Sequence, residues 1–207
     1  MAAIITKEQT KPVAHNSREI IFQRSLQLFT ERGYDGTSID DIRQAAGFKS
    51  KASFYTHFKS KEELAGALLT KILEDEARIT GRAFQAAEAE PLAQFLAVGR
   101  AFIEWGLTNP REYAFCFLRT QQEMLIQGRY SAESEQSNDA IEQLVGQIRA
   151  RYPVRQIANK ALTSMIVGLI SKAVIDQGSF GQISLEAKID QIVEMALGVL
   201  FTEKVGF

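Results

Sequence analysis

Residues 37–58 read TSIDDIRQAAGFKSKASFYTHF, two short helical patterns on either side of a glycine. The first pattern turns Ile42 to its apolar face, and the second turns Phe54 and Phe58, four residues apart, to its own. Gly47 stands between the two patterns, where a tight turn favours a residue without a side chain. A helix, a glycine turn and a second helix predict a helix-turn-helix, which suits the major groove of DNA.

Basic residues gather around the second of these helices. The segment from Lys49 to Lys61 holds four lysines and a histidine but no acid, in a chain whose net charge is −1. Residues 1–62 carry ten Lys or Arg and seven Asp or Glu, whereas the rest of the chain carries fourteen and eighteen. A basic cluster in a weakly acidic chain indicates a confined anionic partner, and a solvated helix face is the alternative.

The second helix, expected from about Ser50 to His57, presents hydroxyls and lysines on its polar side. Short hydroxyls suit base edges, and long cations suit phosphates, whose bound counterions are released on contact. The residues expected to meet DNA here are Lys49, Ser50, Lys51, Ser53 and Thr56, with the Tyr55 hydroxyl on a phosphate beside His57.

Helical patterns fill the rest of the chain. A first helix is expected from about Ser17 to a stop at Gly33, and Thr37 with Asp40 suggests a capping box before the next. Ser60 and Glu63 form a second capping-box motif ahead of a fourth helix. Later helices are expected from Pro91 to about 107, from Pro110, over 132–152 and 155–177, and from Ser184 to about 201, with a loop at 128–131. We find no alternating strand pattern, so nine helices and an all-α fold are predicted.

Composition excludes several classes of protein. Hydrophobic residues make up 45% of the 207 and charged residues 24%, which is a globular composition. The only cysteine, Cys116, can complete neither an intrachain disulfide nor a thiolate zinc site, and we expect it to be a buried, inert thiol. No apolar run approaches about 20 residues and no secretory signal is evident, so a cytoplasmic protein without membrane contact is expected. The sequence indicates no metal site, cofactor or catalytic group, and we expect no enzyme.

The order of residues from about Ser17 to Leu69, a quarter of the chain, resembles the N-terminal domain of the TetR family of bacterial transcriptional regulators. The matching positions are Arg18, Leu28-Phe29, Gly33-Tyr34, Thr37-Ser38-Ile39, Ile42, Ala46-Gly47, Phe54-Tyr55, His57-Phe58 and Lys61-Glu62-Glu63-Leu64. Residues 1–15 are polar and show no periodicity, which predicts a flexible tail. The resemblance implies a DNA-binding domain at 16–75 and an effector-binding and dimerisation domain at 76–207.

The resemblance also implies residue roles. Thr37 and Ser38 would touch backbone phosphate through side chain and main-chain N–H. The stretch Lys51, Ala52 and Ser53 matches the one that enters the groove. Positions that hold phosphate in the family are matched by Tyr55, His57 and Lys61.

Two positions depart from the family pattern. Eight steps separate Gly47 from Tyr55, where seven are usual, and Arg43 stands where a small residue is common. Our hypothesis is that the extra residue displaces the second helix and lets Arg43 reach a phosphate.

The middle of the chain concentrates bulky, adaptable side chains of the kind that line a pocket between helices. Our candidates for contact with an effector are Phe102, Trp105, Phe117, Gln121, Met124 and Met165. Such an aromatic stripe at helical spacing can equally be plain core. An apolar lining favours a small hydrophobic or amphipathic effector.

The last two long patterns each have a broad apolar face with small residues, which suits a two-fold four-helix interface between two copies of the chain. Closure of one subunit's own core is the alternative. We therefore expect a homodimeric regulator of transcription, a repressor that binds a palindromic operator and is modulated by a small effector. The alternatives are an activator of the same fold, a helical enzyme with a helix-turn-helix that does not bind DNA, and a module whose basic face binds protein or acidic membrane.

Overall fold

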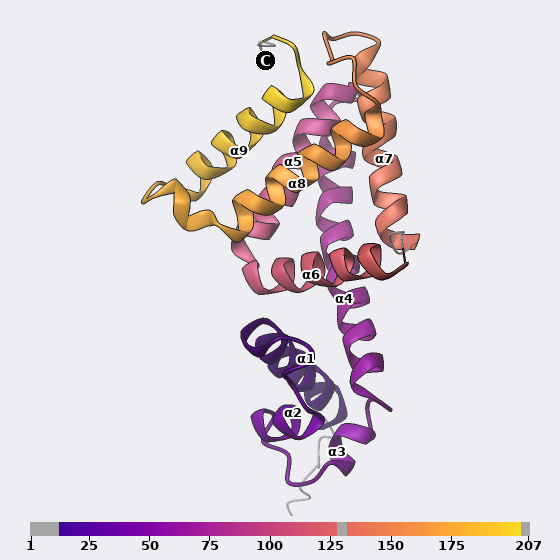
Figure 1. Cartoon of the computed structure of the whole chain (residues 1–207), viewed down its shortest axis with the longest axis vertical. Coiled ribbons are helices and arrows are strands. Elements are labelled where there is room, and N and C mark those ends of the chain that lie inside the picture. The colour runs from indigo at the N-terminus through magenta and orange to yellow at the C-terminus, as the bar shows by residue number, and fades with distance from the viewer. Residues whose placement is uncertain (1–12, 128–131, 204–207) are drawn as a thin grey trace, which may run out of the picture. The chain divides into compact units, whose positions relative to one another are not determined.

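The computed structural model describes residues 13–127 and 132–203, with side chains over 17–119 and 138–203. This part of the chain holds nine α-helices, one 3-10 helix and a single isolated β-bridge between Val154 and Phe201 (Figure 1). The helices are α1 (Val13–Arg32), α2 (Ile39–Ala45), α3 (Ala52–Tyr55), α4 (Lys61–Ala86), α5 (Pro91–Thr108), α6 (Pro110–Gln127), α7 (Ala132–Arg149), α8 (Asn159–Ile175), η1 (Gln177–Phe180) and α9 (Leu185–Leu200). The prediction of an all-α fold is confirmed.

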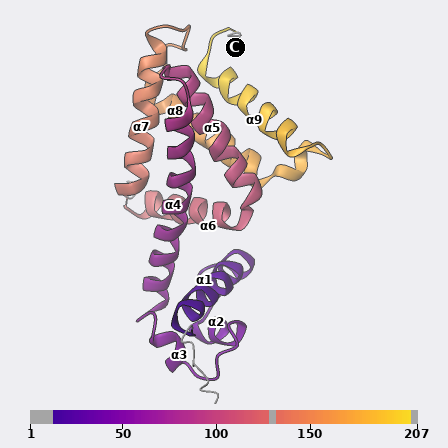
Figure 2. The same cartoon turned by 180° about the vertical axis from the view of Figure 1, so that it is seen from behind.

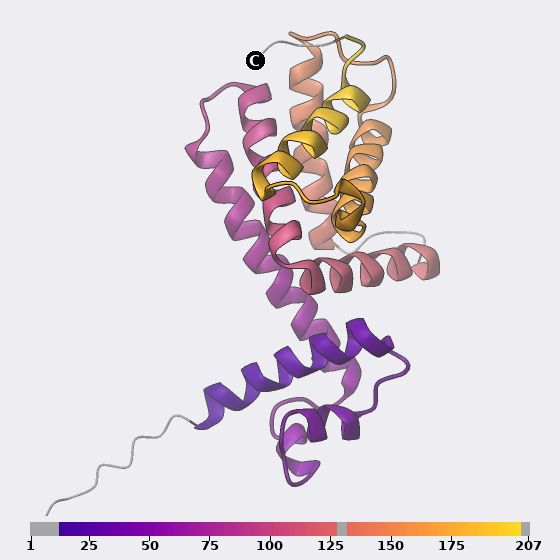
Figure 3. The same ribbon diagram turned by 90° about the vertical axis from the view of Figure 1, so that its left-hand side faces the viewer.

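The chain divides between Leu68 and Leu69 into two compact units. In the first unit, α1 lies across α2 and α3 (Figure 3). Ile21, Phe54 and Leu64 are fully buried there. Gly33 ends α1 with a φ of 78°, the left-handed conformation predicted from its place after the helix.

In the second unit α5, α7, α8 and α9 pack against one another, and α6 runs crosswise to α5 and α8 (Figures 1 and 2). The hydroxyl groups of Tyr113 on α6 and Ser171 on α8 share a buried hydrogen bond of 2.8 Å. Gly106 on α5 allows this approach, because a Cβ atom there would stand 2.7 Å from the ring of Tyr113. Cys116 is buried as expected, and burial raises the pKa of its thiol to about 12, so the thiol stays protonated.

Helix α4 is continuous across the division of the chain. Its residues 61–68 belong to the first unit and its remaining residues to the second. None of the described helices has the length and apolar character needed to cross a bilayer.

Local capping explains where several helices begin. Ser38 caps α2 through a capping box with Asp41, one residue later than the predicted pair of Thr37 and Asp40. The hydrogen bonds from the backbone and side chain of Ser38 lower the pKa of Asp41 below its usual value. Before α4, the N–H of Glu63 donates to Ser60 Oγ as predicted, while the Glu63 carboxylate accepts from the N–H of Lys59.

Several predicted boundaries are wrong. Helix α7 ends at Arg149, three residues before the predicted end, and α8 ends at Ile175, two residues before it. Helix α1 begins at Val13, four residues before the predicted start. Helix α3 spans only four residues, shorter than predicted. A series of turn-type hydrogen bonds covers the longer segment, from the bond that the Ser50 carbonyl accepts to the bond that the N–H of Phe58 donates. Helix α8 begins at Asn159 instead of about 155, because the residues before it hydrogen-bond to the end of α9. The N–H of Arg155 donates to the Leu200 carbonyl, and the N–H of Thr202 donates to the Pro153 carbonyl. The expected loop at 128–131 lies outside the described residues.

Candidate functional site

The helix-turn-helix is built as the sequence predicts. Gly47 adopts a φ of 73°, and its N–H donates to the Gln44 carbonyl at 3.0 Å, which turns the chain between α2 and α3. Ile42 and Phe54 are both fully buried, one on each helix. Burial of these two side chains holds α3 against the rest of the unit, because each loses its contact with water only in this arrangement.

Thr37 has an internal role. Its side chain is 1% exposed, and its hydroxyl lies 3.3 Å from the Leu28 carbonyl oxygen and 2.9 Å from that of Gly33. Its N–H donates to the Tyr34 carbonyl. The side chain therefore ties the end of α1 to the start of α2, and it does not face solvent, where a phosphate would lie.

Lys61 braces the same turn from α4. Its Nζ donates to the carbonyl oxygens of Tyr34, at 2.8 Å, and of Thr37, at 3.0 Å. The ammonium also lies 4.1 Å from the centre of the Tyr34 ring, a cation–π contact. The family resemblance assigns the Lys61 ammonium to a phosphate, but here it already binds two main-chain carbonyls and an aromatic ring.

Arg43 is held within the helix-turn-helix. Its Nε lies 2.8 Å from Asp40 Oδ1, and its Nη1 donates to the Phe48 carbonyl at 2.7 Å. This pairing lowers the pKa of Asp40 and raises that of Arg43. The guanidinium fastens the turn after Gly47 to α2, so in this structure Arg43 binds Asp40 and the Phe48 carbonyl, and its reach to a phosphate stays a hypothesis.

Of the remaining predicted contacts, Ser38 is exposed as the N-cap of α2, and the others form one surface around α3, which we call the reading face. Its exposed members are Lys49, Ser50, Lys51, Ala52, Tyr55 and Thr56, and Ser53 and His57 are half-buried beside them. The Tyr55 ring is 51% exposed and meets the buried Phe54 edge-on, so its orientation is supported from beneath. The hydroxyls of this face, together with its lysines, can donate hydrogen bonds to phosphates and base edges.

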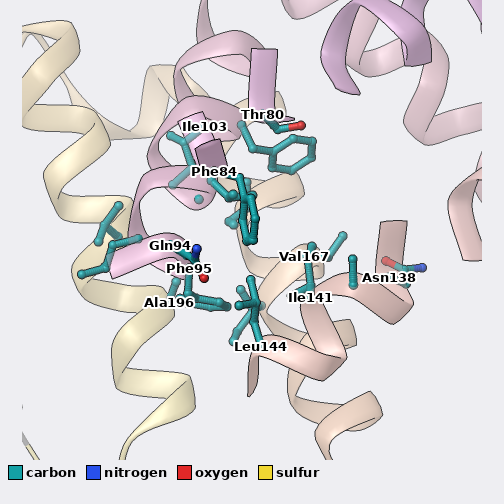
Figure 4. Close-up of a pocket in the computed structure, with 18 of the residues that line it drawn as sticks. Thr80, Phe84, Gln94, Phe95, Ile103, Asn138, Ile141, Leu144, Val167 and Ala196 are labelled. Atoms are coloured by element: carbon teal, nitrogen blue, oxygen red, sulfur yellow. The ribbon is translucent and has the colours of Figure 1, made fainter. Parts of the chain in front are cut away.

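The second unit encloses a cavity of about 540 Å³ between α4, α5, α7, α8 and α9 (Figure 4). Most of its wall is aliphatic or aromatic. Phe84 from α4 and Leu144 from α7 point toward each other across it in Figure 4. The volume and the mainly apolar lining are those of a site for a small molecule.

Few polar groups line this cavity. Neutral ones come from Thr80 on α4, Gln94 on α5 and three amides on α7. Glu76 on α4 is the one ionisable residue among the described lining residues. Burial raises the pKa of its carboxyl to about 7, and Thr80 offsets this only in part.

Comparison with known proteins agrees with this geometry. The profile of the family described as "Bacterial regulatory proteins, tetR family" matches residues 21–68, which include the helix-turn-helix. Over these residues the chain is similar to the DNA-binding part of the TetR family. It is also 34% identical over 87 residues to the HTH-type transcriptional repressor DhaR of Mycobacterium sp. (strain GP1), across 42% of this chain and 43% of that one. The chain thus spans less than half the length of this curated relative.

Two solved structures share the fold over most of the chain. The ketosteroid transcriptional regulator KstR2 of Mycobacterium tuberculosis superposes with a TM-score of 0.75 and 21% identity, covering 93% of this chain and 98% of that one. AibR, solved in complex with isovaleryl coenzyme A and operator DNA, superposes with a TM-score of 0.70 and 20% identity, covering 86% and 97%. At these identities the likeness establishes the fold.

The structure does not bring together all the residues that we expected at an effector. Phe102 lines the cavity, whereas Trp105 is buried behind it with its ring 6.1 Å from that of Phe102. Phe117 is half-buried on α6 and does not line the cavity, and Met165 is 61% exposed on α8. The side chains of the other two candidates, Gln121 and Met124, lie outside the described residues.

Sequence reasoning missed the contribution of α4 to the cavity. Glu76 continues the row Leu64, Leu68 and Ile72, in which a residue faces the same side every four positions. The first three are buried. A carboxylate that continues a buried apolar row is the signal that would have identified it.

The Thr37 bracing can be tested by removing its hydroxyl alone. Thr37→Val keeps the shape but leaves two buried carbonyls without this donor, so we expect the first unit to lose about 1–2 kcal/mol of stability, measured by urea unfolding. Thr56→Val is the matched control, because the Thr56 hydroxyl donates to the Ala52 carbonyl on an exposed surface. Equal effects of the two substitutions would contradict the bracing role.

The raised pKa of Glu76 predicts that the native chain loses stability as the pH rises. In the folded chain the carboxyl titrates near 7, and in the unfolded chain near 4.5, so the folded state binds more protons between these values and stability falls as the pH rises through them. At pH 8 we expect Glu76→Gln to be more stable than the native chain by about 2–3 kcal/mol, and at pH 4 to be equal to it. Thermal unfolding at both pH values measures this. A constant difference would show that Glu76 is not the titrating group.

Proposed function

We propose that this chain is a transcriptional repressor that binds duplex DNA through the reading face and is released by a small molecule in the cavity of the second unit. The observation that carries the proposal is the arrangement around α3. Thr37, Lys61 and Arg43 brace the helix-turn-helix from within, and hydroxyls and exposed lysines such as Lys51 stand on its outer surface. A rigid short helix with cations and donors outward fits a major groove about 12 Å wide.

The proposal distributes two tasks over the reading face. Lys49, Lys51, Tyr55 and His57 would contact phosphates, which supply affinity without sequence preference. Ser53, with the hydroxyl of Ser50, would meet base edges. Repression is supported by the relative DhaR, which is named as a repressor.

A homodimer would bring two reading faces to one operator. Helix α8 exposes Met165, Gly168 and Ile175 along one side, and α9 exposes Met195 and Gly198. Exposed apolar and small residues at helical spacing let helices of two copies approach closely. The two-fold symmetry of such a pair predicts a palindromic operator whose half-sites lie about 34–36 Å apart.

Helix α4 offers a covalent path from the cavity to the reading face. One end carries Lys61, which braces the turn before α2, and the other carries Glu76, Thr80 and Phe84, which line the cavity. An effector with greater affinity for one conformation of α4 would shift the population of dimers toward a spacing that does not fit the operator. AibR, of the same fold, was solved with both an acyl coenzyme A and operator DNA.

Gel retardation of the DNA that flanks the chain's own gene tests the DNA-binding proposal. Lys51→Ala should weaken binding to every duplex and lower the slope of log affinity against log salt by about 1, because one phosphate contact is lost. Lys160→Ala, an exposed lysine of the second unit, is the control and should change neither quantity. Retardation that is the same for both variants would refute the reading face.

The dimer is tested by placing a charge on the exposed side of α8 that holds Met165. Met165→Glu should convert a particle of twice the 23.1 kDa chain mass into one of the single mass in sedimentation velocity, because a carboxylate would be buried at the interface. Leu118→Glu places the same charge at an exposed leucine of α6 and should leave the mass unchanged. A native chain that sediments as a monomer at micromolar concentration would contradict the proposal.

A further inference from the structure

The described residues that line the cavity carry no positive charge. Among the described residues that line it, none is basic, and Glu76 is the single acid. A ligand in this space would meet no lysine or arginine from the described walls. This arrangement distinguishes between ligands by charge, because an ion transferred into an apolar site needs a partner of opposite sign.

Glu76 has no cation beside it in the described part of the chain. The groups that face it from α6 are Tyr113 and Cys116. Burial raises the pKa of both, and the negative charge of Glu76 adds to this, as does that of Glu112 for Cys116. The lining residues of α5, α7, α8 and α9 add no titratable group. Its ionised form is disfavoured by burial, so a cation that enters the cavity would gain a partner that the protein leaves unmatched.

Aromatic faces add to this preference. Phe84, Phe95 and Phe102 line the cavity from α4 and α5, and Figure 4 shows the ring of Phe84 directed into the space. The faces of aromatic rings attract cations, and the attraction grows where water is excluded. The neutral amides, such as Gln94, can accept hydrogen bonds from an ammonium group.

We propose that the cavity takes a lipophilic amine, an apolar molecule with a protonated nitrogen, and that the Glu76 carboxylate is the group that binds this nitrogen. The inference rests on the proposed function, in which the same cavity holds the effector, and it names the chemical class of that effector. A fatty carboxylate or another anion is disfavoured, since it would lie beside Glu76 with no cation from the described walls.

Three probes of equal chain length separate charge from hydrophobicity. Octylammonium, octan-1-ol and octanoate share their hydrocarbon and differ in charge, and all are monomeric at low millimolar concentration. Their binding to the full chain without DNA can be followed by calorimetry and by the fluorescence of Trp105. That residue is the only tryptophan, and it stacks on the cavity residue Phe102. At pH 8 we expect octylammonium to bind about tenfold more tightly than octan-1-ol, and octanoate to bind most weakly.

Substitution assigns the preference to one carboxylate. Glu76→Gln should lower the affinity for octylammonium about tenfold and leave that for octan-1-ol unchanged. Glu74→Gln makes the same change two residues away on the exposed side of α4 and should alter neither affinity. Thermal unfolding of each variant verifies its fold.

The native chain gives a second readout that needs no substitution. As the pH falls below about 7, protonation of Glu76 competes with the amine, so the affinity for octylammonium should fall toward tenfold per pH unit. The affinity for octan-1-ol should stay constant over the same range. In the Glu76→Gln variant the decline for the amine should disappear.

The outcomes separate this inference from the proposed function. Octanoate binding as tightly as octylammonium, failure of all three probes to bind, or an unchanged amine affinity in Glu76→Gln would overturn the inference while DNA retardation remained intact. A chain that prefers the amine through Glu76 but never retards DNA would keep the inference and refute the repressor. Release of a retarded duplex by octylammonium, and not by octanoate, would support both.

Discussion

The first unit depends on hydrogen bonds to four main-chain carbonyl groups around the α1–α2 turn. The carbonyl oxygens of Leu28, Gly33, Tyr34 and Thr37 accept hydrogen bonds from two side chains, the hydroxyl of Thr37 and the ammonium of Lys61. A buried carbonyl without a donor costs free energy on the order of 1–3 kcal/mol, so these donors fix the chain at this point. Because α2 begins at the end of this turn and α4 supplies Lys61, the position of the reading face follows from it.

Much of this architecture can be predicted from local sequence patterns. The glycines at 33 and 47 stand where the backbone adopts positive φ, and the apolar spacing of Ile42, Phe54 and Phe58 marks the buried sides of the helix-turn-helix. Such features depend on a few neighbouring residues, and a sequence reveals them directly. Boundaries such as the start of α8 depend instead on a distant partner, since Val154 pairs with Phe201. No local pattern announces that pairing.

The candidate sites show the same division. An exposed lysine or tyrosine near α3 follows from helical spacing, but the inward turn of Thr37 and the capture of Arg43 by Asp40 and the Phe48 carbonyl require the folded geometry. In the second unit, aromatic content pointed to α5 and α6, whereas five helices contribute the cavity wall and α4 contributes its charge. Cavities arise from what packing leaves empty, and composition alone does not locate them.

The regular course of α4 within the second unit has a consequence for how the cavity wall can vary. Glu76, Thr80 and Phe84 follow one another at steps of four along this helix, and all three line the cavity. Inserting a single residue among them would rotate the residues beyond it by about 100° about the helix axis. Substitutions can therefore accumulate along this side of α4, whereas the gain or loss of one residue would turn part of the row away from the cavity.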